Sequence, residues 1–175
     1  ATGRPELAVT KGDGGLYVDK EGLHWVDPFR QEVRDYNIAL AREVARMGFD
    51  EIQFDYLRFP SYGPIAQRVY SQDATFEART AAIAEFCAQA YAALCLTPAF
   101  ISADIFGLTL WVDPSRDLGI GQRLDDIAPY VHYISPMLYP STFGKGNLGF
   151  DDPSLHPYEI VYHGVLKGKE RTRAL

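Results

Sequence analysis

Two aspartates near the ends of apolar stretches are the residues of this sequence best suited to acid–base chemistry. Asp55 lies in GFDEIQFDYLRFPS, and Asp104 lies in FISADIF. A carboxylate buried alone is strongly disfavoured, so each must be hydrogen-bonded, paired with a cation or open to a cleft. Two carboxylates at one cleft can hydrolyse a glycosidic bond. One protonates the leaving oxygen, while the other attacks the anomeric carbon or activates water.

The neighbours of the two aspartates predict different roles for them. Arg58 follows Asp55 by three residues, and a nearby cation keeps a carboxylate ionised. We therefore expect Asp55 to be the nucleophile or the base. Asp104 has apolar neighbours on both sides, which should raise its pKa and hold the proton that a leaving group needs. Asp104 is thus the predicted general acid.

Aromatic side chains near these motifs are candidates for substrate binding, because flat apolar rings can stack on the faces of sugars. Aromatic residues are also common in cores and as loop anchors, so each has a purely structural alternative. Together with a guanidinium that can bind or orient the substrate, the predicted substrate-binding set is Trp25, Tyr56, Arg58, Phe106 and Tyr139.

The elements that must position these residues alternate between helices and strands. Apolar residues recur at helical spacing in three segments, and each segment precedes an apolar strand-like run. The predicted helices are 31–47, 74–95, a short one near 123–130 and one starting at Pro157; the predicted strands are 51–57, 100–106 and 131–138. This alternation indicates an α/β fold in which the three strands are adjacent and parallel.

Polar side chains accumulate toward the C-terminal end of each predicted strand. In parallel α/β folds, and in (β/α)₈ barrels above all, that rim carries the active site. Period-two alternation places Asp104 on the face opposite its aliphatic neighbours, pointing into the mouth of a barrel. We therefore expect a fold of the (β/α)₈ TIM-barrel type.

Composition and motif searches exclude several other functions. The 175 residues are 47% hydrophobic, which is enough for one folded domain, and the net charge of −6 argues against a nucleic-acid-binding surface. No run approaches the roughly 20 apolar residues that span a membrane. The four histidines lack zinc-site spacing, and there is no GxSxG elbow or phosphate-binding loop. The sequence thus predicts no metal, no cofactor, no nucleic acid and no membrane-spanning segment.

Four long motifs carry a resemblance to a known family. These are residues 23–61, SADIFGLT, residues 117–147 and PYEIVY, in that order along the chain. Over roughly residues 4 to 166 the sequence resembles a bacterial family of TIM-barrel glycoside hydrolase domains, long catalogued as a domain of unknown function. The resemblance implies that Asp55 and Asp104 are the acidic residues of the FDY and ADIFG motifs. It also implies a carbohydrate substrate and a location outside the cytoplasm or in the cell envelope.

The expected barrel is larger than this chain. A (β/α)₈ barrel takes about 250 residues and eight strands, whereas only three to four βα units are predicted here. We therefore expect residues 1–175 to form one partial barrel domain, truncated at both ends, with the remainder supplied by a longer chain.

Two other interpretations compete with glycoside hydrolysis. The same aromatic and acidic rim suits a non-catalytic glycan-binding barrel of the cell envelope. Alternatively, Asp55 pairs with Arg58 and only holds a loop. Carboxyl groups of Asp55 and Asp104 within about 5 to 10 Å of each other on one cleft would favour catalysis.

Overall fold

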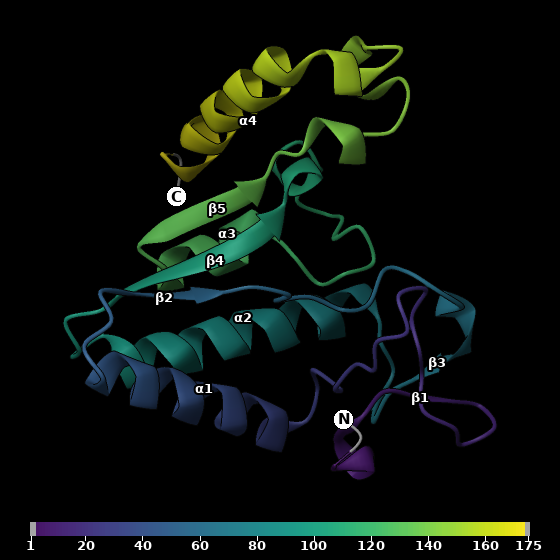
Figure 1. Cartoon of the computed structure of the whole chain (residues 1–175), viewed down its shortest axis with the longest axis vertical. Helices are drawn as coiled ribbons and strands as arrows, with labels where there is room; N and C mark the ends of the chain where they lie inside the picture. The colour runs from purple at the N-terminus through teal and green to yellow at the C-terminus, as the bar shows by residue number, and fades with distance from the viewer. Residues whose placement is uncertain (1–2, 174–175) are drawn as a thin grey trace.

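The computed structural model describes residues 3–173, and its centre is a parallel sheet of three strands. In the order in which they pair, these are β2 (Glu51–Phe54), β4 (Phe100–Phe106) and β5 (Tyr133–Met137). Both pairings are parallel, as the sequence predicted (Figure 1). β2 is shorter than predicted because Tyr56 adopts a left-handed backbone conformation, with φ of 53°, that cannot continue an extended strand.

The expectation of a (β/α)₈ TIM-barrel type fold is wrong. Besides the three parallel strands, the described residues contain only a two-residue antiparallel ribbon of β1 (Thr10–Lys11) and β3 (Arg68–Val69). β2 and β5 form the two edges of the main sheet, which is open rather than closed. Helix and strand alternate in open and closed parallel sheets alike, so the alternation predicted the pairing but could not decide whether the sheet closes.

Helices α1 (Gln31–Arg46) and α2 (Phe76–Leu94) lie side by side and cover one face of the sheet (Figure 1). Both are predicted helices. Gly48, with φ of 93°, follows the end of α1 in the left-handed conformation that favours glycine. Thr75 caps α2 by accepting a hydrogen bond from the backbone N–H of Ala78. The core between helices and sheet includes Ala41, Ala45, Ile52, Leu94 and Ile101.

Helix α4 (Pro157–Thr172) lies at the other end of the molecule, beyond β5 (Figure 1). It begins at the predicted proline and packs on the segment Gly107–Leu110 that follows β4. Gly164 allows a close approach of α4 to Leu138, because a Cβ atom here would lie 2.5 Å from the Leu138 side chain, which would have to shift. Arg171 donates to the backbone oxygen of Thr109 at 2.8 Å, so α4 holds the chain just beyond β4. The short α3 (Leu124–Ile127) precedes β5.

The segment before α1 has no predicted element and is organised by isolated bridges, including Ala8 with Val26 and Val18 with His24. Asp19 is buried and accepts hydrogen bonds from two backbone amides and from the indole of Trp25 at 2.9 Å. This turn brings Trp25 to the end of β2, where its ring centroid lies 5.8 Å from that of Tyr56. Across residues 3–173, the length and hydropathy needed to cross a membrane are found in none of the helices.

Candidate functional site

The two faces of the sheet differ in chemistry. Ile52, Ile101, Ala103 and Ile105 are buried on the face toward the helices. The strand register pairs Gln53 with Ser102 and Phe54 with Ala103. Asp55 directly follows β2, so extending this register by one residue places it beside Asp104. On its other side, Asp104 pairs with Ser135 of β5. The opposite face therefore carries a row of polar groups at the C-terminal ends of three neighbouring strands: Gln53, Asp55, Ser102, Asp104 and Ser135.

Asp104 is half-buried and its carboxylate accepts a hydrogen bond from the side-chain amide of Gln53. Burial raises the pKa of Asp104, and the negative charges of Asp55 and Glu51 raise it further. Hydrogen bonds from Gln53 and Ser135 oppose the shift without cancelling it. Asp104 thus holds a proton at a higher pH than an ordinary aspartate does.

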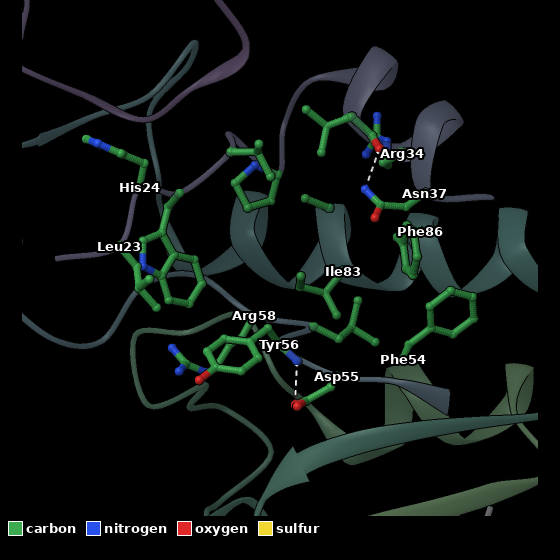
Figure 2. A pocket seen from close by; sticks show the side chains of 16 residues that line it. Leu23, His24, Arg34, Asn37, Phe54, Asp55, Tyr56, Arg58, Ile83 and Phe86 are labelled. Atoms are coloured by element: carbon green, nitrogen blue, oxygen red, sulfur yellow. Dashed lines mark hydrogen bonds between the residues drawn. The ribbon is translucent and has the colours of Figure 1, made fainter. Parts of the chain in front are cut away.

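Asp55 lies in a different environment. Its carboxylate is exposed and accepts a hydrogen bond from the backbone N–H of Tyr56 at 2.6 Å (Figure 2). That amide belongs to a non-glycine residue in the left-handed region, which is uncommon and is a form of strain found at functional sites. β2 ends at Phe54, and the turn at Tyr56 leaves the carboxylate of Asp55 at the sheet rim.

Arg58 is buried and lies in a cage of four aromatic rings. Its guanidinium carbon is 4.8 Å from the ring centroids of Trp25 and Phe106, 5.1 Å from that of Tyr56 and 5.7 Å from that of Tyr62. Figure 2 shows Tyr56 and Arg58 side by side at the end of β2. Within residues 3–173, no carboxylate oxygen lies within 4.0 Å of its guanidinium, so Asp55 and Arg58 form no direct ion pair.

A cleft of about 400 Å³ opens beside this cage and brings most of the predicted site together. Its lining includes five of the seven residues singled out from the sequence, namely Asp55, Tyr56, Arg58, Phe106 and Tyr139. Asp104 and Trp25 do not line this cleft. Asp104 precedes Phe106 of the cleft wall by two residues, on the same strand face. Trp25 contacts Arg58 and Tyr56, which line the cleft.

A second cavity of about 410 Å³ lies on the helix side of the same rim (Figure 2). Asp55, Tyr56 and Arg58 border both cavities. The remaining walls are mainly apolar and come from α1, α2, β2 and the segment before α1, including Trp25, Phe54, Ile83 and Phe86. The residues after β2 therefore form a wall between a polar, aromatic cleft and an apolar cavity.

Gln122 is a positioning residue that the sequence did not reveal. Its buried amide donates to the backbone oxygens of Leu57 at 3.0 Å and Asp104 at 3.2 Å, and accepts from the backbone N–H of Phe106 at 2.8 Å. One side chain thus links the ends of β2 and β4 behind the two aspartates. No sequence pattern distinguishes it from an exposed glutamine, whereas period-two alternation does place Gln53 on the face of Asp55.

Metal binding has no support from the residues described. Between residues 3 and 173, no group of three or more His, Cys, Asp or Glu side chains is arranged to hold a metal ion.

Comparison with known proteins gives one family and one structural relative. A family model described as "Putative glycosyl hydrolase domain" matches residues 1–175, which is the whole chain. Among solved structures, the crystal structure of a hypothetical protein from Ruminiclostridium thermocellum ATCC 27405 is similar at 35% identity, with a TM-score of 0.48. That match covers 59% of this chain and 50% of the other, so it spans half the length of that protein. No curated protein matches.

Proposed function

We propose, from the premise that this chain belongs to the family described as "Putative glycosyl hydrolase domain", that it hydrolyses O-glycosidic bonds of a poly- or oligosaccharide. Family membership confirms the resemblance found in the sequence. The observation that supports the proposal is that Asp104 on β4 lies next to the end of β2, which Asp55 directly follows, and that Asp55 lines an aromatic cleft. Two carboxylates with different environments are what the reaction requires.

The environments support one assignment of roles. Asp104, whose pKa is raised by burial and by the charge of Asp55, donates its proton to the leaving oxygen. Asp55, exposed at the rim, attacks the anomeric carbon while the glycosidic bond between that carbon and the leaving oxygen breaks. Water then displaces Asp55 from the glycosyl ester, and Asp104 takes up the proton of that water.

Attack by Asp55 on the anomeric carbon implies retention of the anomeric configuration. Retaining enzymes hold their carboxyl groups about 5 to 5.5 Å apart, against about 6.5 to 9.5 Å for inverting enzymes. The sugar would lie on exposed rings at the cleft, because Tyr56 and Tyr139 are 54% and 59% exposed. Exposed aromatic faces next to polar groups are typical of sugar contacts.

The test compares Asp55→Asn and Asp104→Asn on polysaccharides and on activated aryl glycosides, with exposed Asp151→Asn as the matched control. A good leaving group needs little protonation, so Asp104→Asn should retain appreciable activity on aryl substrates alone. Asp55→Asn should lose both activities, and the control should lose neither. If parent and both variants are equally inactive on every glycan yet bind one of them, the protein is a glycan-binding domain and the catalytic proposal is wrong.

A further inference from the structure

Arg58 is a buried cation without a partner of opposite charge. The whole residue is only 6% exposed, and burial lowers the pKa of its guanidinium. Asp55 and Asp19 favour its charged form, but neither carboxylate reaches ion-pairing distance in the part of the chain that the structure describes. A desolvated guanidinium normally has an anion against it, since removing water from a charge is costly unless the charge is paired.

Part of the hydrogen-bonding capacity of Arg58 is unused. Nη1 donates to the backbone oxygen of Phe59 at 3.3 Å and to the Ser61 hydroxyl at 3.2 Å. Its Nε and Nη2 groups make no hydrogen bond to any residue between 3 and 173, and Arg58 lines the 400 Å³ cleft. Four aromatic rings surround the guanidinium and restrict its movement, and the free donors belong to a side chain that lines the cleft.

A second cation, Lys20, contacts a wall of the same cleft without lining it. The ammonium of Lys20 is 4.1 Å from the centroid of the Tyr62 ring, which also contacts Arg58 and lines the cleft. The two carboxylates that line the cleft, Glu21 and Asp55, are exposed, and solvent screens them. The buried charge at this cleft is therefore the positive charge of Arg58, and the negative charges of Glu21 and Asp55 lie at its exposed edge.

We propose that the cleft takes a sugar unit bearing a carboxylate, which pairs with the free donors of Arg58. A guanidinium presents parallel N–H groups that match a carboxylate in a bidentate manner, whereas a neutral sugar leaves the charge unpaired. The carboxylate can belong to the ring, as in a uronic acid, or to a lactyl ether, as in muramic acid. This inference rests on the proposed function for the identity of the ligand as a sugar, and it specifies the class of sugar.

Binding of small sugars tests the inference without requiring hydrolysis. Titration calorimetry and saturation-transfer NMR with D-glucuronate and N-acetylmuramic acid are compared with D-glucose and N-acetylglucosamine. The acids should bind at least tenfold more tightly than their neutral counterparts, and the pair that shows the preference identifies the source of the carboxylate. Arg58→Gln should abolish the preference, whereas Arg42→Gln, on the exposed face of α1, should preserve it.

Arg58→Lys is a second variant that tests the inference even if Arg58→Gln fails to fold. Lysine keeps the positive charge among the rings but not the bidentate geometry, so the preference for acids should fall severalfold while neutral sugars bind as before. Equal binding of acids and neutral sugars by the parent, or an unchanged preference in the folded Arg58 variants, overturns the inference.

The same samples separate this inference from the proposed function. Hydrolysis of neutral aryl glycosides at rates independent of Arg58 would overturn the inference and leave the proposed function standing. An Arg58-dependent preference for acidic sugars with no hydrolysis of any glucuronide or glucoside would support the inference and overturn the proposed function.

Discussion

Two arginines flank the segment that follows β2, and their surroundings are opposite. Arg79 of α2 donates to both carboxylate oxygens of Asp117, at 2.8 and 3.0 Å, and also to the backbone oxygen of Ala74. Asp117 in turn accepts from the backbone N–H groups of Gly119 and Gly121. Arg58, by contrast, has aromatic faces around it and no carboxylate within ion-pairing distance among the described residues.

The difference separates structural from functional charge. The Arg79–Asp117 pair uses its groups internally and holds the loop whose Ile120 accepts a hydrogen bond from the backbone of Phe59. The Arg79–Asp117 pair therefore helps to hold the segment after β2 in place without lining the cleft. The rim of β2 leaves donors on Arg58 and a carboxylate on Asp55 available to a ligand. Groups that are not satisfied internally are the ones expected to act on a substrate.

The largest effect should come from removing Asp55. Asp55→Ala should lower kcat/KM by about 10⁴-fold or more, because the attacking group is lost. The melting temperature should stay near that of the parent, since the side chain is exposed. Added azide should restore turnover of an activated aryl glycoside by taking the vacated position. Full activity of Asp55→Ala would show that the Asp55 carboxylate takes no part in the reaction.

The next largest effect should be on stability, at Asp117. Asp117→Asn leaves the partly buried Arg79 without its counter-charge. The side chains of Asp117 and Arg79 are only 5% and 18% exposed, so the free energy of unfolding should fall by about 3 to 5 kcal/mol. Urea denaturation measures this loss. A change below about 1 kcal/mol, the range of surface pairs, would show that the loop does not depend on the pair.

The same pair predicts a pH dependence of stability. Although burial acts to raise it, hydrogen bonds from Arg79 and from two backbone amides hold the pKa of Asp117 below its usual value. A depressed folded-state pKa gives stability that is present above the unfolded pKa, near 3.9, and is lost as pH falls through the folded pKa. The difference in unfolding free energy between parent and Asp117→Asn should therefore shrink in acid. A constant difference down to the lowest accessible pH would contradict the prediction.

A smaller effect is expected for Arg58→Lys. A charge-assisted hydrogen bond contributes about 1.5 to 3 kcal/mol, so losing the fork should reduce kcat/KM about 10- to 100-fold. The melting temperature should change little, because the ring cage retains a cation. Kinetics and thermal denaturation of the same preparation measure both. A large drop in melting temperature with unchanged kinetics would place Arg58 in the same structural class as Arg79.

The smallest effect concerns the pH profile of activity. The Gln53 amide lowers the pKa of Asp104, against burial, which raises it. Gln53→Met should therefore raise that pKa further. Because the general acid must be protonated, the alkaline limb of the kcat/KM profile should move to higher pH. A shift to lower pH, or none, would mean that Asp104 does not supply the proton.

Much of the local structure could be predicted from the sequence. The strand at 100–106 was predicted with the observed bounds, and the helices at 31–47 and 74–95 agree to within two residues. The strand at 51–57 was predicted too long because Tyr56 leaves the extended region, which an aromatic residue in an apolar run does not signal. The fold class was wrong because strand count and closure are properties of the whole sheet.

The sequence by itself determined the periodic elements and the face on which Asp55 and Asp104 lie, because hydrophobic periodicity is local and acts over a few residues. Only the tertiary structure decided which charges are satisfied. Arg79 meets Asp117 across 38 positions, and the cage of Arg58 is assembled from Trp25 and Phe106, which lie far apart in the chain. Pairing of charges depends on distances of a few ångströms between distant segments, and those distances exist only after the chain has packed.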